Sequence, residues 1–345
     1  MMKPQQTQGL TATIDWLEFT ILDIELEKAL TEVLQLPAAE FSPLDKGRFG
    51  YQKQVKWSEG NVFVMYNEPD EVPNKPNSDR MGVHVMISGT GCRQYEVRHP
   101  LKKLLLFLTI LDERVNFSRI DLAIDDQLDQ TINFERIHSA ALARHFTSRW
   151  SKWDELNSRQ STSGEFLGRT MYFGSQASDI FCRIYDKALE RKNNDEAAAD
   201  LPERWTRLEI IYKKERAKQL VYHMVDHHVP VGTAVRGTLN QYIRFLKLPP
   251  NPDQNKARWP TAPWWDQLLD GVGKLQLTIE KEKRSINDME EWIEQQIAPT
   301  IAAILTAREG DMGWLHEIIG KGAQRLSQRH RDAITQYLKR EEIKR

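Results

Sequence analysis

Hydrophobic and polar residues alternate along several short stretches of the chain, which is the pattern of strands with one buried face. The predicted strands are residues 11–20, 48–56, 61–66, 82–88, 117–125, 169–174, 179–185 and 204–212. Helical spacing of apolar residues predicts helices over residues 25–34, 101–113 and 134–145. Several strands follow one another with no helix between them. This order predicts an α+β fold with a largely antiparallel sheet.

The pattern changes after about residue 230. A proline-rich break at residues 249–252 precedes a tryptophan-rich stretch at 258–265, and apolar residues recur at helical spacing from residue 288 to the end. We therefore expect an α+β domain over residues 1–230 and a mainly helical C-terminal region over residues 231–345.

Tyr185 lies between two cations in one predicted strand. Arg183, Tyr185 and Lys187 are two residues apart, so a strand would place all three side chains on the same face. A phenol can attack a phosphate and can also leave it, and nearby positive charge favours the phenolate and the anionic transition state. The alternative is a half-buried strand tyrosine whose charged neighbours are solvated.

Two other predicted strands carry an arginine followed two residues later by an acid. Arg119 precedes Asp121, with Asp125 further along the same face, and Arg207 precedes Glu209. Carboxylates from two strands could hold one Mg²⁺ or Mn²⁺ ion, because these cations prefer oxygen ligands. We expect Asp121 and Glu209 to be metal ligands, Asp125 to be a further candidate, and Arg207 to offset phosphate charge. Simple ion pairing of these acids is the alternative.

His84 is a further candidate metal ligand, because it lies between two valines in the predicted strand 82–88. A histidine that is hydrogen-bonded within the sheet is the alternative.

Length, charge and cysteine content limit the class of protein. The chain has 345 residues, 40% of them hydrophobic, a net charge of −1 and two cysteines. It has no apolar run near the ~18 residues of a membrane span and no signal-peptide core, so we expect a cytoplasmic protein without a membrane partner. The net charge does not favour DNA binding, but residues 317–345 carry eight Lys or Arg against four acids, and residues 213–218 are also basic.

Several motifs together resemble the replication initiation factor family, whose members start rolling-circle replication of plasmids and some phages. The similar segments are residues 15–20, 87–93, 118–125, 168–175, 178–179, 183–187, 205–209, 258–260 and 263–265. They span most of the chain in the order found in the family.

The resemblance implies that Tyr185 nicks one strand of an origin, forms a 5′-phosphotyrosyl link and frees a 3′-hydroxyl, while acidic residues hold Mg²⁺ or Mn²⁺. The expected partners are single- and double-stranded origin DNA. The C-terminal region would bind DNA or form a homodimer. Because the chain lacks a nucleotide-binding loop, a separate host helicase would unwind the DNA. Two alternatives remain, namely an origin-binding protein that cuts nothing and a phage strand transferase.

Overall fold

The computed structural model describes residues 10–68, 81–194, 202–275 and 293–326, with residues 277, 286, 289–290, 330–331, 334–335 and 337–338. Its contacts divide the chain into two compact units, Met1–Ile279 and Glu280–Arg345. Helices that follow residue 230 pack against the sheet of the first unit. The division therefore comes later than the domain boundary expected at residue 230.

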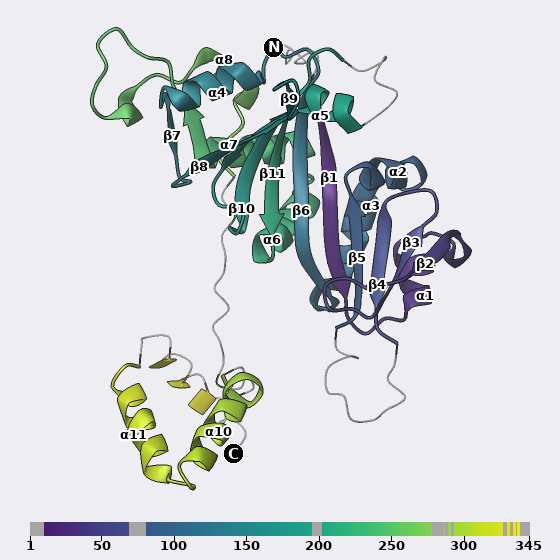
Figure 1. The fold of residues 1–345 in the computed structure, drawn as a ribbon, viewed down its shortest axis with the longest axis vertical. Helices are drawn as coiled ribbons and strands as arrows, with labels where there is room; N and C mark the ends of the chain where they lie inside the picture. Colours follow the sequence, from purple (N-terminus) through teal and green to yellow (C-terminus); the bar gives the residue numbers. More distant parts are fainter. Residues whose placement is uncertain are drawn as a thin grey trace. The chain divides into compact units, whose positions relative to one another are not determined.

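One ten-stranded antiparallel sheet forms the centre of the first unit (Figure 1). The strand order is β2-β3-β4-β5-β1-β6-β11-β10-β9-β8, and a second sheet pairs β12 with β7. The strands are β1 (Leu10–Ile21), β2 (Phe41–Leu44), β3 (Lys53–Trp57), β4 (Val62–Tyr66), β5 (Val83–Ser88), β6 (Val115–Asp126), β7 (Phe146–Ser148), β8 (Trp153–Arg159), β9 (Phe166–Phe173), β10 (Ile180–Asp186), β11 (Thr206–Lys213) and β12 (Ile243–Phe245).

Helices cover one face of this sheet, where α2, α3, α4, α6 and α7 contact the strands. The helices of the first unit are α1 (Leu26–Lys28), η1 (Ala29–Val33), η2 (Ala38–Glu40), α2 (Thr90–Arg98), α3 (Leu101–Leu111), η3 (Asp112–Arg114), α4 (Phe134–Leu142), α5 (Lys187–Asn194), α6 (Glu215–Asp226), α7 (Val231–Tyr242), η5 (Lys256–Arg258) and α8 (Pro263–Leu269). The second unit contains η6 (Ile293–Ile297), α10 (Ala298–Ala307) and α11 (Met312–Ala323).

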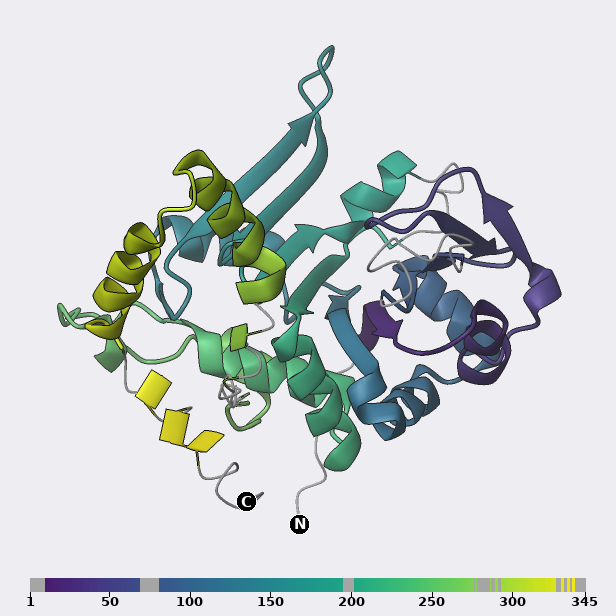
Figure 2. The same cartoon turned by 90° about the horizontal axis from the view of Figure 1, so that it is seen from below.

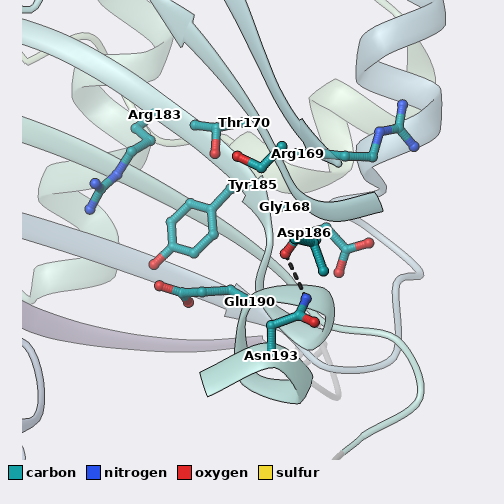
Figure 3. Close-up of a pocket in the computed structure, with 10 residues that line it drawn as sticks. Gly168, Arg169, Thr170, Arg183, Tyr185, Asp186, Glu190 and Asn193 are labelled. Atoms are coloured by element: carbon teal, nitrogen blue, oxygen red, sulfur yellow. Dashed lines mark hydrogen bonds between the residues drawn. The ribbon is translucent and has the colours of Figure 1, made fainter. Parts of the chain in front are cut away.

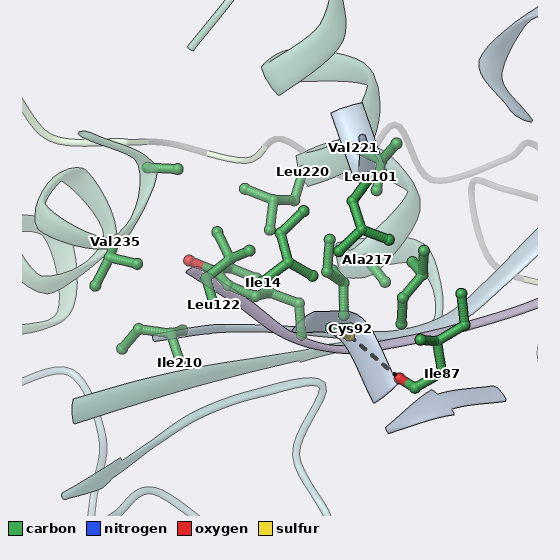
Figure 4. Packing of buried hydrophobic residues seen from close by; sticks show 14 of the residues in the cluster. Ile14, Ile87, Cys92, Leu101, Leu122, Ile210, Ala217, Leu220, Val221 and Val235 are labelled. Carbon is green, nitrogen blue, oxygen red and sulfur yellow. Dashed lines mark hydrogen bonds between the residues drawn. The ribbon is translucent and has the colours of Figure 1, made fainter. Parts of the chain in front are cut away.

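The hydrophobic core lies between this face and the helices (Figure 4). Leu122 of β6 and Ile210 of β11 belong to it, together with Leu220 and Val221 of α6. Because side chains alternate along a strand, the residues between these aliphatic positions point to the opposite face. That opposite face, which we call the polar face, therefore carries the arginines and acids of β6, β10 and β11.

The antiparallel α+β fold is confirmed, and each predicted strand has a counterpart, although the strand predicted from residue 48 begins only at Lys53. Strands β2, β7, β8 and β12 were not predicted. Pro43 interrupts the strand pattern of β2, and β8 is exposed along nearly its whole length, so neither shows the alternation of a half-buried strand. Figure 2 shows the hairpin of β8 and β9 projecting beyond the rest of the sheet.

Two other predictions concern the basic tail and a membrane-spanning helix. The basic tail is described only in part, because most residues after Leu326 lie outside the described residues. In the parts of the chain that the structure describes, no helix is long and apolar enough to cross a membrane.

Candidate active site

Tyr185 lies near the end of β10, between β9 and β11 on the polar face. It is paired across the sheet with Arg207 of β11, which in turn is paired with Asp125 of β6. Its hydroxyl donates a hydrogen bond of 2.6 Å to Oε1 of Glu209. The sheet order therefore brings together β6, β10 and β11, the three strands in which the candidate residues were found.

Glu209 is the carboxylate at the centre of the site, and none of its surface is exposed. Its Oε2 accepts hydrogen bonds from Nε of Arg183, at 2.9 Å, and from Nη2 of the same side chain. The Arg183 guanidinium also lies 5.2 Å from the centroid of the Tyr185 ring. One carboxylate thus holds both the tyrosine and a neighbouring cation.

The pKa of the Tyr185 phenol is raised, first by burial and then by the charge of Glu209, while Arg207 and Arg183 lower it. The sequence indicated that the two cations would favour the phenolate. The structure differs, because burial and the adjacent carboxylate outweigh the cations. Tyr185 is therefore a neutral phenol here, and it already has an acceptor for its proton.

Lys187 is placed differently from the sequence prediction. It begins helix α5 instead of continuing the strand. Its Nζ still lies 5.3 Å from the Tyr185 ring centroid and is ion-paired with Glu190. The turn into α5 thus keeps this cation beside the tyrosine.

A cavity of about 470 Å³ opens at Tyr185, between the β8–β9 hairpin and α5. Figure 3 shows Arg183, Tyr185 and Glu190 projecting into it, with Thr170 and Asn193 on its walls. Neither Thr170 nor Asn193 was a candidate site residue, although Thr170 lies in the segment 168–175 that resembles the family. The cavity gives a ligand direct access to a tyrosine that is otherwise largely buried.

Arg207 and Asp125 form a closed ion pair beneath the site. Arg207 is 3% exposed, and its Nε and Nη2 donate to the two oxygens of Asp125 at 2.6 and 2.7 Å. Its Nη1 donates to Asp15 at 2.7 Å and lies 3.9 Å from Oε1 of Glu209. Arg207 was expected to offset phosphate charge. The structure places it beneath the site, buried and hydrogen-bonded to Asp125 and Asp15, and it is not among the residues that line the cavity.

Asp15 was missed as part of this network. It accepts from both Arg207 and Arg93, the second bond measuring 2.9 Å. Asp15 and Arg93 do lie in two of the segments that resemble the replication initiation factors. Their pairing depends on strand order, however, which local sequence does not show.

Asp121 lies on the polar face one strand away from Glu209, offset by two residues in register. Both of its oxygens accept from Arg119, at 2.9 and 2.6 Å. Burial raises the pKa of Asp121 to about 6, Arg119 lowers it, and the charge of Glu209 raises it again. Asp121 and Glu209 are thus close enough to interact, although each is paired with an arginine.

Among the residues that the structure describes, no group of three or more His, Cys, Asp or Glu side chains could hold a metal ion. Two carboxylates on neighbouring strands still fit Mg²⁺ or Mn²⁺, because Mg²⁺ usually keeps several waters and takes only one or two protein carboxylates. Asp125 lies directly opposite Arg207 in the sheet, and Arg207 and Trp205 donate to its oxygens. The oxygens of Asp121 and Glu209 also accept hydrogen bonds, so a metal ion at either acid would have to displace a donor.

His84 is not part of this group. It lies on β5, and its Nδ1 is 2.9 Å from Oγ1 of Thr20. Burial lowers its pKa to about 4. Four strand steps separate β5 from β10, so the structure does not bring His84 together with Tyr185.

Comparison with known proteins gives the family of the chain. The sequence profile of the replication initiation factor family matches residues 115–319. The chain belongs to this family. The profile of the rolling-circle replication initiation protein N-terminal domain also matches, over residues 11–106. The family expected from the motifs is confirmed.

Individual relatives extend over most of the chain. A Bacillus subtilis (strain 168) protein named as the DNA relaxase NicK is 27% identical over 305 residues, which cover 87% of this chain and 82% of that protein. A Staphylococcus aureus replication initiation protein is 25% identical over 283 residues, covering 80% and 76%. The structure of a rolling-circle replication initiator protein from Geobacillus stearothermophilus matches with a TM-score of 0.66 and 30% identity, covering 79% of this chain and all of that chain.

Proposed function

We propose that this rolling-circle replication initiator nicks one strand at a plasmid or phage origin, with Tyr185 as the nucleophile. The observation that carries the proposal is the hydrogen bond from Tyr185 to the buried Glu209, at the edge of a cavity that also receives Arg183. In covalent catalysis the nucleophile is usually hydrogen-bonded to a base, and a third group orients that base.

The reaction requires one bond to form and one to break. The phenolic oxygen of Tyr185 attacks the scissile phosphorus and passes its proton to Glu209. The bond from phosphorus to the 3′ oxygen breaks, so the downstream DNA remains attached to the tyrosine through its 5′ phosphate. The leaving 3′ oxygen takes back one proton, which Glu209 can supply, and becomes the 3′-hydroxyl primer.

Two cations are placed to offset the charge of the phosphate. Arg183 and Lys187 both lie beside the Tyr185 ring, and the Arg183 side chain is 32% exposed, so it can reach a ligand. Fixed positive charge of this kind favours the transition state, in which negative charge develops on the phosphate oxygens. Arg207 acts indirectly, because it is buried and holds Asp125 and Asp15.

Asp121 and Glu209 are the residues that we propose to hold Mg²⁺ or Mn²⁺. A divalent ion bound there would polarise a phosphate oxygen as a Lewis acid. The offset of the two carboxylates on adjacent strands supports this role. Calorimetric titration with Mn²⁺ tests it, and an unchanged titration in Asp121→Asn and Glu209→Gln would remove the proposal.

The partners follow from the same role. We propose that origin DNA is bound as duplex and as single strand in the cytoplasm, that a separate host helicase unwinds it, and that residues 280–345 contribute duplex binding or dimer contacts.

Cleavage of DNA from beside the protein's own gene tests the function. End-labelled oligonucleotides that tile this region, incubated with Mg²⁺ or Mn²⁺, should give one shortened product that a polymerase can extend. Specific binding without any cleavage would instead support the non-cleaving origin-binding protein.

A further inference from the structure

The polar face continues from the active site across β1 and β5 to β3 and β4, where it carries a second hydrophobic cluster. Tyr51, Met65 and Met86 are its buried members, and Trp16 and Phe63 are among the residues only partly buried against it. The cluster is separate from the main core, on the face opposite to α2, α3, α4, α6 and α7. Large apolar side chains thus remain accessible beside the catalytic strands.

Phe49 is the most exposed aromatic ring of this region. It is 62% exposed, and its ring lies 5.4 Å from that of His84. Its φ of 56° is in the left-handed region, which a bulky side chain rarely adopts. Residues held in sparsely populated backbone regions occur more often at functional sites than elsewhere.

Cations are placed over the aromatic rings. Arg48 and Lys56 lie 5.0 and 5.6 Å from the Phe63 ring centroid, and Arg119 lies 4.6 Å from that of Trp16. Two acids lie among them. Glu18 accepts a hydrogen bond from Nε1 of Trp16 at 2.8 Å, and Asp121 is ion-paired with Arg119, whose side chain is 27% exposed. Rings interleaved with Arg and Lys are the usual composition of a surface that binds unpaired nucleic acid.

Two buried polar atoms of this face lack a partner among the described residues. They are Nε2 of His84 and Oε1 of Gln54, on side chains that are each 6% exposed. Buried polar groups are nearly always hydrogen-bonded, so two unpaired atoms below this surface are unusual.

We propose that this surface, an aromatic track formed by Trp16, Phe49 and Phe63 with Arg48, Lys56 and Arg119, binds the single-stranded DNA that flanks the scissile phosphate. Bases stack on the rings, and the cations contact the phosphates. The inference rests on the proposed function, because the DNA strand that is cut at Tyr185 would continue along the same face.

The distance across the sheet is consistent with a short single strand. Five strand steps separate β4 from β10, which is about 24 Å at ~4.8 Å a step. A strand with the ~3.4 Å spacing of stacked bases would cover this distance with about seven nucleotides, and an extended strand with fewer.

The experiment measures binding without cleavage. In a Tyr185→Phe background, the affinity for fluorescent oligothymidylates of increasing length is measured by anisotropy. Phe49→Ala and Phe63→Leu should each weaken binding of the longer oligomers roughly 5- to 100-fold, as expected for the loss of one stacking ring. Arg48→Ala should also lower the salt dependence of binding.

Phe107→Ala is the matched control, because this partly exposed phenylalanine lies on α3, on the helical side of the sheet. Equal affinities in Phe49→Ala, Phe63→Leu and the control, for every length, would overturn the aromatic track. Phe49 is too exposed for its loss to unfold the protein, so a weak-binding Phe49→Ala variant cannot be attributed to misfolding. The assay measures affinity and requires no cleavage. It therefore tests the aromatic track even if Tyr185 is not the nucleophile.

Discussion

The hydroxyl of Tyr185 donates a hydrogen bond of 2.6 Å to Oε1 of Glu209, whose other oxygen is held by Arg183. This contact joins the proposed nucleophile to its proposed proton acceptor before any DNA binds. It also explains why the phenol stays neutral in the resting protein, since burial and Glu209 raise its pKa. Attack on a phosphate must therefore be coupled to transfer of the phenolic proton.

Glu209→Gln tests this coupling. A glutamine keeps the size and can still accept from Tyr185, but it cannot take up the proton. We expect the rate of nicking to fall roughly 10²- to 10⁴-fold, the usual contribution of a general base. Single-turnover formation of the protein–DNA adduct measures it. Glu155→Gln on β8, outside the cavity, is the control, and equal rates in the two variants would remove Glu209 from the reaction.

Asp125→Asn tests the closed ion pair with Arg207. The change leaves the guanidinium buried without its full partner, and loss of one member of a buried pair costs about 3–5 kcal/mol. Urea denaturation should show this loss in the free energy of unfolding. Asp154→Asn, in the exposed pair with Lys152, should change stability by less than about 0.5 kcal/mol. An equally small effect for Asp125→Asn would contradict the structural role.

His84 gives a prediction on pH. Burial lowers its pKa from 6.5 to about 4 in the folded protein, whereas the unfolded chain takes up the proton near 6.5. The unfolded state therefore binds more protons between these values, and stability is lost as the pH falls through this window. From pH 7 to pH 5 the loss that His84 causes is about 2 kcal/mol.

His84→Gln should remove that part of the pH dependence. The free energy of unfolding, measured at both pH values, should then fall by about 2 kcal/mol less in the variant than in the unmodified protein. His316→Gln, an exposed position on α11, should behave like the unmodified protein. The same fall in all three proteins would show that His84 is not the group that titrates.

Local sequence was sufficient for the strands that bury one face. β6 and β11 were predicted because Leu122 and Ile210 alternate with charged residues, and alternation follows directly from strand geometry. β8 and α5 were not predicted. β8 has no apolar face to bury, and α5 begins at Lys187, which the spacing from Tyr185 placed on the strand.

The site was predictable in its residue types but not in its pairings. Three strands with an arginine two residues from a reactive side chain indicated one shared surface, and the sheet order confirms it. Which acid pairs with which arginine depends on register. Arg207 is ion-paired with Asp125 and Asp15, and Arg183 is ion-paired with Glu209. These partners are far apart in the chain, so the pairs cannot be derived from neighbouring residues.

Covalent attachment of DNA to Tyr185 tests the central claim most directly. Single-stranded DNA from the nicked region is labelled at its 3′ end, so that the label stays on the fragment whose 5′ phosphate would join the tyrosine. The DNA is incubated with the protein and Mn²⁺, and the adduct is separated on a denaturing gel. We predict one adduct, mapped by mass spectrometry to the peptide of Tyr185 and absent from Tyr185→Phe, which should still bind the DNA. An adduct that persists in Tyr185→Phe, carried by Tyr172 or Tyr212, would contradict the account.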